Sequence, residues 1–126
     1  MTTYTLHCFK ESGNSYKVAL ALTFTANLAS YRWLRTFASP APDESVLTYM
    51  RGRAAGAVDI LERHLQARSF VVGERLTIAD VSMAGYVFYP KEELDFDFLA
   101  DYPNIAAWMA RLSQTPGWKA PYELLA

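Results

Sequence analysis

Residues 76–90 read LTIADVSMAGYVFYP and predict the element around which the rest of the fold is arranged. Thr77 is a residue type that caps helix starts, and Asp80 stands three positions later, where its carboxylate can accept a hydrogen bond from the Thr77 backbone N–H. The residues that follow are apolar on nearly every side of a helix. We therefore expect a buried central helix over residues 78–89, which Pro90 ends.

A long helix is predicted upstream of this element. Apolar or small side chains recur at spacings of three and four from Val18 to Phe37, and no Gly or Pro lies between Ser15 and Ser39. The pattern predicts one helix of roughly 24 residues, about 35 Å long, with Ser15 as its N-cap. A short kink near Asn27 is the alternative.

A second long helix follows the break at residues 39–42, which read SPAP. Asp43 is placed to cap it, and the helix should reach about Gln66. Gly52 and Gly56 lie four apart within it, and an interior glycine costs about 1 kcal/mol relative to alanine, so we expect another helix to approach closely there. The expected buried stripe consists of Val46, Met50, Ala54, Ala57, Leu61 and Leu65.

The two ends of the chain complete the predicted fold. Residues 3–9 alternate between apolar and polar side chains, which is typical of a strand. A last main helix should start near Pro103 and end before Thr115, and residues 118–126 should pack back on the body. The prediction is a mainly α protein, a helical bundle preceded by one N-terminal β-strand and a long helix.

Composition limits the classes of function. The chain has 126 residues, a net charge of −1 and 52% apolar residues, so we expect one folded protein with no general attraction to nucleic acid. No apolar run approaches the roughly 20 residues of a membrane span, and no signal peptide is evident, so we expect a cytoplasmic protein that does not enter membranes. Cys8 is the only cysteine, and His7 and His64 lie far apart, so no metal site is predicted and His64 is expected on a helix surface.

Three segments together resemble a known family. Residues 9–22 (FKESGNSYKVALAL), 72–90 (VGERLTIADVSMAGYVFYP) and 102–125 (YPNIAAWMARLSQTPGWKAPYELL) are similar to the first strand and helix, the buried capped helix and the closing helices of bacterial glutathione transferases. The resemblance implies a remnant of the family's thioredoxin-like domain over residues 1–28. It implies the family's helical C-terminal domain over residues 29–126.

The resemblance also implies a missing part. After Ala26 the chain lacks the further strands and the third helix of a thioredoxin-like domain, and it continues into residues 31–34, which resemble the later part of the family's fourth helix. The implied activity is conjugation of glutathione to an unknown electrophile. Because most of the glutathione site is absent, we expect this activity to be reduced or lost.

The resemblance implies which residues would carry the chemistry. Ser12 best matches the residue that activates the thiol of glutathione, the substrate, with Asn14 and Ser15 next, because a donor at a helix N-terminus stabilises a thiolate. The alternative is that Ser15 only caps the helix and that Ser12 belongs to a simple turn. Tyr31, Trp33 and Phe37 match the residues that line an apolar acceptor pocket, with plain packing as the alternative.

Two further expectations concern partners. An unpaired strand and an uncovered helical face both favour association, so we expect a homodimer through the N-terminal strand and the long helix. The alternative function is a non-catalytic helical module used for assembly, as this helical domain is used in some translation factors. A deletion product without a selected function is a third possibility.

Overall fold

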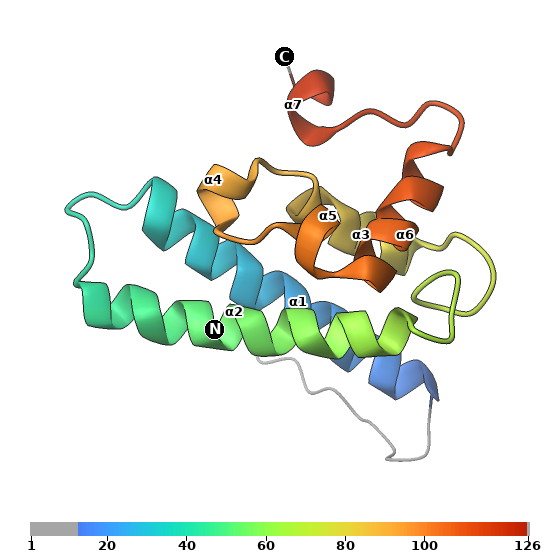
Figure 1. Ribbon diagram of the computed structural model, residues 1–126, viewed down its shortest axis with the longest axis horizontal. Helices are drawn as coiled ribbons and strands as arrows, with labels where there is room; N and C mark the ends of the chain where they lie inside the picture. Colours follow the sequence, from blue (N-terminus) through green and yellow to red (C-terminus); the bar gives the residue numbers. More distant parts are fainter. Residues whose placement is uncertain (1–12, 126) are drawn as a thin grey trace, which may run out of the picture.

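The computed structural model describes residues 13–125, with side chains described from residue 19 onward. These residues are mainly helical and contain no strand, which confirms the mainly α prediction for this part of the chain. The strand expected over residues 3–9 lies outside the described residues. The helices are α1 (Gly13–Thr36), α2 (Glu44–Leu65), α3 (Ile78–Val87), α4 (Lys91–Leu94), α5 (Phe98–Asp101), α6 (Pro103–Ser113) and α7 (Pro121–Leu124) (Figure 1).

Helices α1 and α2 form an antiparallel pair along the longest axis of the molecule (Figure 1). The prediction of one long helix is confirmed, because α1 spans 24 residues without interruption at Asn27. It begins at Gly13, so the prediction that Ser15 is the N-cap was wrong: Gly13 and Asn14 continue the helical backbone. Buried Asn27 ties the two helices together, since its Oδ1 accepts from Arg53 Nε at 3.0 Å.

Helix α2 follows Asp43 and ends one residue before Gln66, as predicted. Most of the predicted stripe is buried, although Val46, in the first turn of α2, is 41% exposed. Gly52 and Gly56 are exposed, and a Cβ built on either would meet no atom within 4 Å. The close helix contact expected at these glycines is therefore absent among the described residues.

Helix α3 begins as the capping box predicts. The Asp80 carboxylate is fully buried, and its Oδ2 accepts from both the backbone N–H and the hydroxyl of Thr77, each at 2.9 Å. Its Oδ1 accepts from the Val71 N–H at 2.8 Å and from Trp108 Nε1 at 3.0 Å. One carboxylate thus joins the start of α3 to the preceding loop and to α6.

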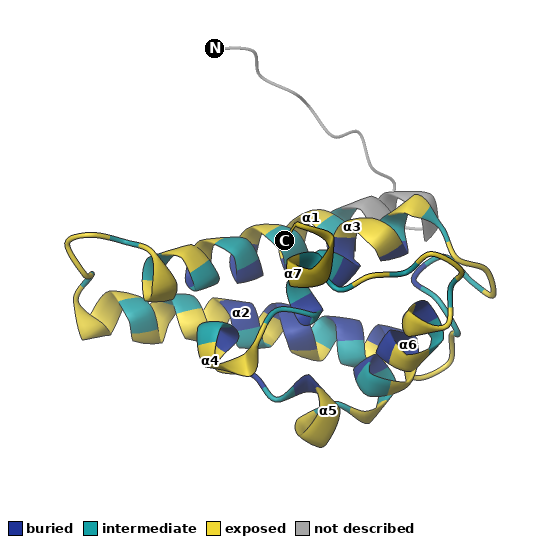
Figure 2. Ribbon diagram, turned by 90° about the horizontal axis from the view of Figure 1, so that it is seen from above, coloured by how far each residue is buried: buried dark blue, intermediate teal, exposed yellow. Residues whose placement is uncertain are grey.

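The expectation that α3 is buried on all sides was wrong. Met83, Ala84 and Val87 are buried, but Ile78 is 80% exposed and Val81 is 49% exposed. Helix α3 is packed between α1 and α6, so the side of α3 that faces neither helix remains open. Figure 2 shows the same division, with buried residues on the inner faces of the helices and exposed residues outside.

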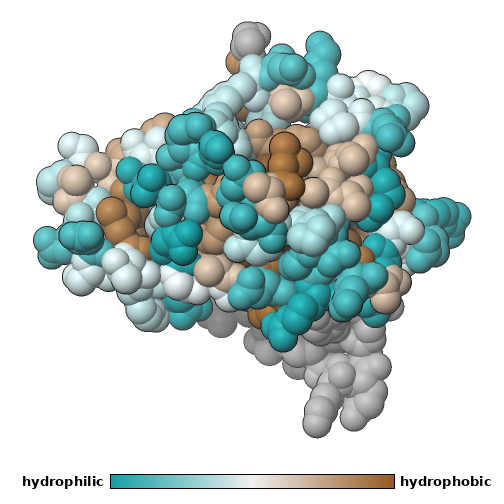
Figure 3. All heavy atoms as spheres, in the orientation of Figure 1, coloured by the Kyte–Doolittle hydropathy of each residue, from teal (hydrophilic) through white to brown (hydrophobic). Residues whose placement is uncertain are grey.

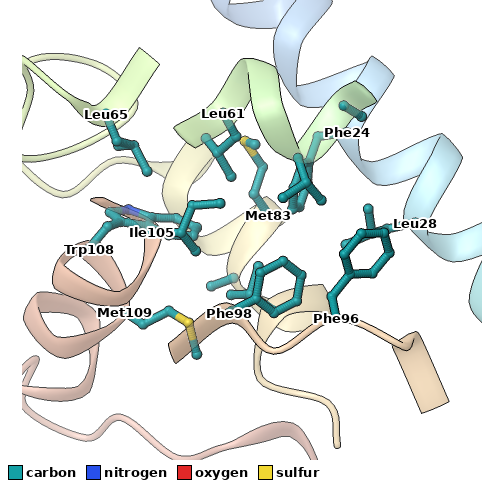
Figure 4. Packing of buried hydrophobic residues seen from close by; sticks show 14 of the residues in the cluster. Phe24, Leu28, Leu61, Leu65, Met83, Phe96, Phe98, Ile105, Trp108 and Met109 are labelled. Atoms are coloured by element: carbon teal, nitrogen blue, oxygen red, sulfur yellow. The ribbon is translucent and has the colours of Figure 1, made fainter. Parts of the chain in front are cut away.

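The core lies where α1, α2, α3 and α6 meet. Figure 4 shows Phe24 and Leu28 from α1, Leu61 from α2, Met83 from α3 and Trp108 from α6 pointing toward one another, and all five are fully buried. Helix α6 is anchored by the Glu62 carboxylate, which accepts from the backbone N–H groups of residues 104 and 105 at 3.0 and 2.9 Å. These N–H groups lie in the first turn of α6, where they lack partners within the helix.

His64 corrects another expectation. It is 5% exposed rather than on the surface, and its Nε2–H donates to the Val71 carbonyl oxygen at 2.9 Å. Val71, in the loop between α2 and α3, is itself fully buried, and its contact with His64 shows that this loop folds back over the last turn of α2. His64 is therefore a polar core residue that holds this loop.

Candidate functional site

A hollow of about 700 Å³ lies beside the C-terminal half of α1. Its lining comes from α1, α2 and α3 and the residue that follows α1. The lining residues are Ala29, Ser30, Arg32, Trp33, Leu34, Phe37, Met50 and Tyr86. Trp33 and Phe37 are 57% and 52% exposed, so the aromatic surface in this hollow is open to a ligand.

The three residues matched to an acceptor pocket lie in different environments. Trp33 and Phe37 line the hollow, four residues apart on one face of the helical chain. Tyr31 does not line it, because it is only 2% exposed and packs edge-on against Phe96 with the ring centroids 6.3 Å apart. The alternative of plain packing describes Tyr31, and a role in ligand binding remains a prediction for Trp33 and Phe37.

Arg32 is the charged group of this hollow. Its Nη2 lies 2.6 Å from Glu93 Oε2, and its Nε donates to the same oxygen at 2.8 Å. Its Nη2 also donates to the Tyr122 hydroxyl oxygen at 2.9 Å, while that hydroxyl donates to Glu93 Oε1 at 2.6 Å. The guanidinium carbon lies 3.5 Å from the ring centroid of Tyr89 and 5.0 Å from that of Phe37.

The ion pair shifts the titration of its members. Burial would lower the pKa of Arg32, but hydrogen bonding to Glu93 and its charge raise it above the ordinary value. Burial would likewise raise the pKa of Glu93, but hydrogen bonds from Tyr122 and Arg32 bring it below the ordinary value. The hydrogen bond to Glu93 raises the pKa of the Tyr122 phenol. The cluster therefore holds a charged arginine, a carboxylate and a neutral phenol at neutral pH.

Sequence reasoning did not single out this cluster. Arg32 is 61 residues from Glu93 and 90 residues from Tyr122 in the chain, so no motif or spacing joins them. The only sequence signal was the expectation that the segment after residue 118 packs back on the body. Tyr122 and Trp118 do pack back, through ring contacts with Tyr89 and Phe88.

Two of the three residues matched to thiol activation lie at the other end of α1. Ser12 is outside the described residues, and Asn14 and Ser15 belong to the first turn of α1. Because α1 is one continuous helix, Ser15 and Trp33 are about 27 Å apart along its axis, at a rise of 1.5 Å per residue. Figure 1 shows the two ends of α1 at opposite sides of the molecule. Within one chain, the thiol site and the acceptor hollow would be separate.

Residues 13–125 lack two other kinds of site. No group of three His, Cys, Asp or Glu side chains in this part of the chain is arranged to hold a metal ion. None of the described helices is long and apolar enough to cross a membrane. Figure 3 shows apolar side chains near the centre of one face, ringed by polar ones, which is an ordinary pattern for a protein surface.

Comparison with known proteins gives a consistent picture. Residues 24–116 match the family model described as "Glutathione S-transferase, C-terminal domain". A crystal structure of a glutathione S-transferase from Xanthobacter autotrophicus superposes with a TM-score of 0.72 at 29% identity, covering 90% of this chain and 58% of that one.

Two curated relatives match shorter stretches. The "Glutathione S-transferase-like protein LUC7" of Fusarium sp is 32% identical over 74 residues, which cover 58% of this chain and 34% of that protein. "Elongation factor 1-gamma-B" of Xenopus laevis is 34% identical over 62 residues, which cover 48% of this chain and 14% of that protein. The chain thus spans less than two thirds of the length of each of these relatives.

Proposed function

Because this chain belongs to the glutathione S-transferase C-terminal domain family, we propose that it is a glutathione transferase-like protein whose hollow beside Arg32 takes an apolar, aromatic electrophile. Trp33 and Phe37 supply flat apolar walls, and the guanidinium of Arg32 supplies a cationic edge. Residues 1–28 would be what remains of the glutathione-binding domain. The single cysteine supports a reducing compartment, the cytoplasm.

Conjugation of glutathione by this chain would be weak or absent. A thiolate must approach the acceptor atom to about 3–3.5 Å before it reacts efficiently. The continuity of α1 carries this proposal, since it keeps Ser15 about 27 Å from Trp33 along the helix axis. A donor at the start of α1 would still stabilise a thiolate, so weak glutathione binding without efficient transfer is the expected behaviour.

The direct test measures glutathione binding and transfer separately. Thermal unfolding with millimolar glutathione reports binding through linkage, and absorbance with an aromatic halide acceptor reports transfer. We expect a small shift in Tm that Ser12→Ala removes, and transfer close to the uncatalysed rate. Ser45→Ala, in the first turn of α2, is the matched control and should change neither measurement. Rapid conjugation that Ser12→Ala abolishes would overturn the proposed weakness and show that residues 12 and 33 meet.

A second candidate function is assembly of two copies, and the exposed face of α1 favours it. Leu22 is 59% exposed, and Leu22, Ala26 and Ala29 follow one another at spacings of four and three residues, on the part of α1 that leads up to the hollow. This α1 stripe adjoins α3, whose Ile78 and Val81 are also exposed. An apolar stripe at this spacing suits a second helix, so we propose a homodimer formed through α1. The match to an elongation factor is compatible with such a non-catalytic role.

A further inference from the structure

Arg32 and Tyr89 contact each other, and each of them lines a hollow. Arg32 lines the hollow of about 700 Å³ described above, and Tyr89 lines a second hollow of about 460 Å³ between the end of α3 and helices α5 and α6. The guanidinium carbon of Arg32 lies 3.5 Å from the Tyr89 ring centroid. This contact therefore joins a residue of one hollow to a residue of the other, and we call the two residues the Arg32–Tyr89 pair.

The last described residues, 118–125, lie against the Arg32–Tyr89 pair, and we call them the C-terminal strap. Trp118 contacts Phe88 with the ring centroids 4.8 Å apart, and Tyr122 contacts Tyr89 edge-on at 5.2 Å. The Tyr122 hydroxyl also lies within hydrogen-bond distance of both members of the Arg32–Glu93 ion pair. Tyr122 is thus the only described residue of the strap that bonds to the charged cluster.

The rest of the strap is weakly held. Helix α7 has four residues, too few to be stable alone, and none of them is buried. Leu124 and Leu125 are 66% and 76% exposed. The strap follows Gly117, whose φ of +81° is readily adopted only by glycine, so its starting direction is set by the backbone. A segment with so few buried contacts opens at a small fraction of the global unfolding free energy.

We propose that the C-terminal strap is a latch, closed by the Tyr122 hydroxyl, whose closing is coupled to occupancy of the Arg32 hollow by an aromatic ligand. When the strap is closed, Tyr122 and Glu93 hold the guanidinium over the Tyr89 ring, at the edge of the hollow that Arg32 lines. A ligand that packs against Trp33, Phe37 and the held guanidinium binds the closed form better. Coupling of this kind is reciprocal, so the ligand closes the strap by the same factor by which the strap strengthens binding.

The inference deepens the proposed function, because it depends on the hollow taking an aromatic ligand. The latch itself can be tested without one. Lys119 lies in the strap and is exposed, so trypsin cleavage after Lys119 reports strap opening by mass spectrometry. Arg75, exposed in the loop between α2 and α3, provides an internal reference in the same digest.

The first variant removes only the hydroxyl. Tyr122→Phe keeps the ring against Tyr89 and should raise the rate of cleavage after Lys119 about three- to tenfold, with no change after Arg75. Tyr49→Phe is the matched control, because the exposed Tyr49 hydroxyl also accepts a hydrogen bond from an arginine, Arg53, at 3.4 Å on α2. A Tyr122→Phe cleavage rate equal to that of the wild type would overturn the latch.

The second measurement tests the coupling, with 8-anilinonaphthalene-1-sulfonate as an aromatic probe. We expect probe fluorescence that Trp33→Ala removes, slower cleavage after Lys119 when the probe is bound, and weaker probe binding by Tyr122→Phe. Probe binding at Trp33 that leaves cleavage after Lys119 unchanged refutes the coupling and leaves the proposed function standing. Fluorescence that Trp33→Ala does not reduce refutes the ligand hollow itself, and the coupling with it.

Discussion

At the scale of single residues, Asp80 organises more of the fold than any neighbouring side chain. Its two oxygens accept four hydrogen bonds from Val71, Thr77 and Trp108, and all four donors lie within 3.0 Å. The side chain is completely buried, so no water replaces a lost bond from the surface. A group that both starts a helix and joins it to the loop and to α6 should be sensitive to small changes.

We predict that Asp80→Asn lowers the free energy of unfolding by about 2–4 kcal/mol. The asparagine amide has one accepting oxygen, so its NH₂ group would face two of the four donors. Urea denaturation followed by circular dichroism measures the loss. Asp59→Asn, at an exposed position on α2, is the control and should change stability by less than about 0.5 kcal/mol. A loss below about 1 kcal/mol for Asp80→Asn would contradict this account.

The ion pair of Arg32 and Glu93 predicts a dependence on pH. The pKa of Glu93 is lowered in the folded state, so its carboxylate stabilises the fold above its ordinary pKa and loses this effect as pH falls through the lower, folded value. The surrounding groups are Tyr122 on the strap, Arg35 on α1 and the neighbouring Lys91 and Glu92 on α4.

We therefore expect Glu93→Gln to lower Tm by about 2–4 °C at pH 7, and the difference from wild type to shrink as the pH falls below about 4.5, the ordinary pKa of a glutamate. Thermal unfolding of both proteins at several pH values gives this comparison. Glu92→Gln, at the exposed preceding position of α4, should show no such pH-dependent difference. A Glu93→Gln effect that is constant from pH 7 to pH 3 argues against the charge of Glu93 as its cause.

At the scale of elements, α2 contains two interior glycines that lower its helix stability, and no close contact among the described residues explains them. Gly52 and Gly56 lie inside the helix, where glycine raises the entropy of the unfolded chain, yet the described residues leave open space at both positions. Within a single copy, a methyl group at either position meets no obstacle. Alanine substitutions at these two positions therefore distinguish an effect on helix stability from an effect on contact with a partner.

We predict that Gly52→Ala and Gly56→Ala each raise the free energy of unfolding by about 0.5–1 kcal/mol, measured by denaturant unfolding at low protein concentration. Gly117→Ala is the opposite control, since a φ of +81° should make alanine there cost about 1 kcal/mol. If either α2 variant is destabilised instead, something outside the described residues packs against that glycine.

Helix α1 is the element whose continuity decides the chemistry. Its sequence from Ser15 to Ser39 predicted one helix, because the apolar spacing has no break and no Gly or Pro interrupts it. The structure confirms the helix, and the consequence for Trp33 and Ser15 follows from its length alone. A helix cannot bring its two ends together, so one chain does not place the two halves of the predicted chemistry side by side.

At the scale of the whole molecule, the exposed α1 stripe should bring two copies together. We predict that the wild type elutes with a mass of twice 14.2 kDa in size-exclusion chromatography with light scattering, and that Leu22→Glu elutes at 14.2 kDa with an unchanged far-ultraviolet spectrum. Leu125→Glu, at an exposed position outside the stripe, should remain a dimer. A wild-type mass of 14.2 kDa at every concentration would reject the homodimer.

The sequence alone was sufficient to predict the four longer helices, α1, α2, α3 and α6, and the capped start of α3, because these depend on neighbours three and four residues away, such as Thr77 and Asp80. The four-residue helices α4, α5 and α7 were not predicted. The sequence also predicted that the tail after residue 118 returns to the body. Apart from the N-cap of α1, its errors concerned which faces are covered: His64 is buried, and Ile78 and Val81 are open. Helical periodicity places side chains on a face but does not say what packs there.

The candidate site depends on the packing of the helices. Arg32, Glu93 and Tyr122 come from α1, α4 and α7, and their contact depends on how three separate elements pack. Tyr31 and Trp33 are two residues apart in the chain, yet one is buried against Phe96 and the other opens into the hollow, because successive helical positions point in different directions. Local interactions set where the helices begin and end, whereas burial and long-range contacts set what their faces do.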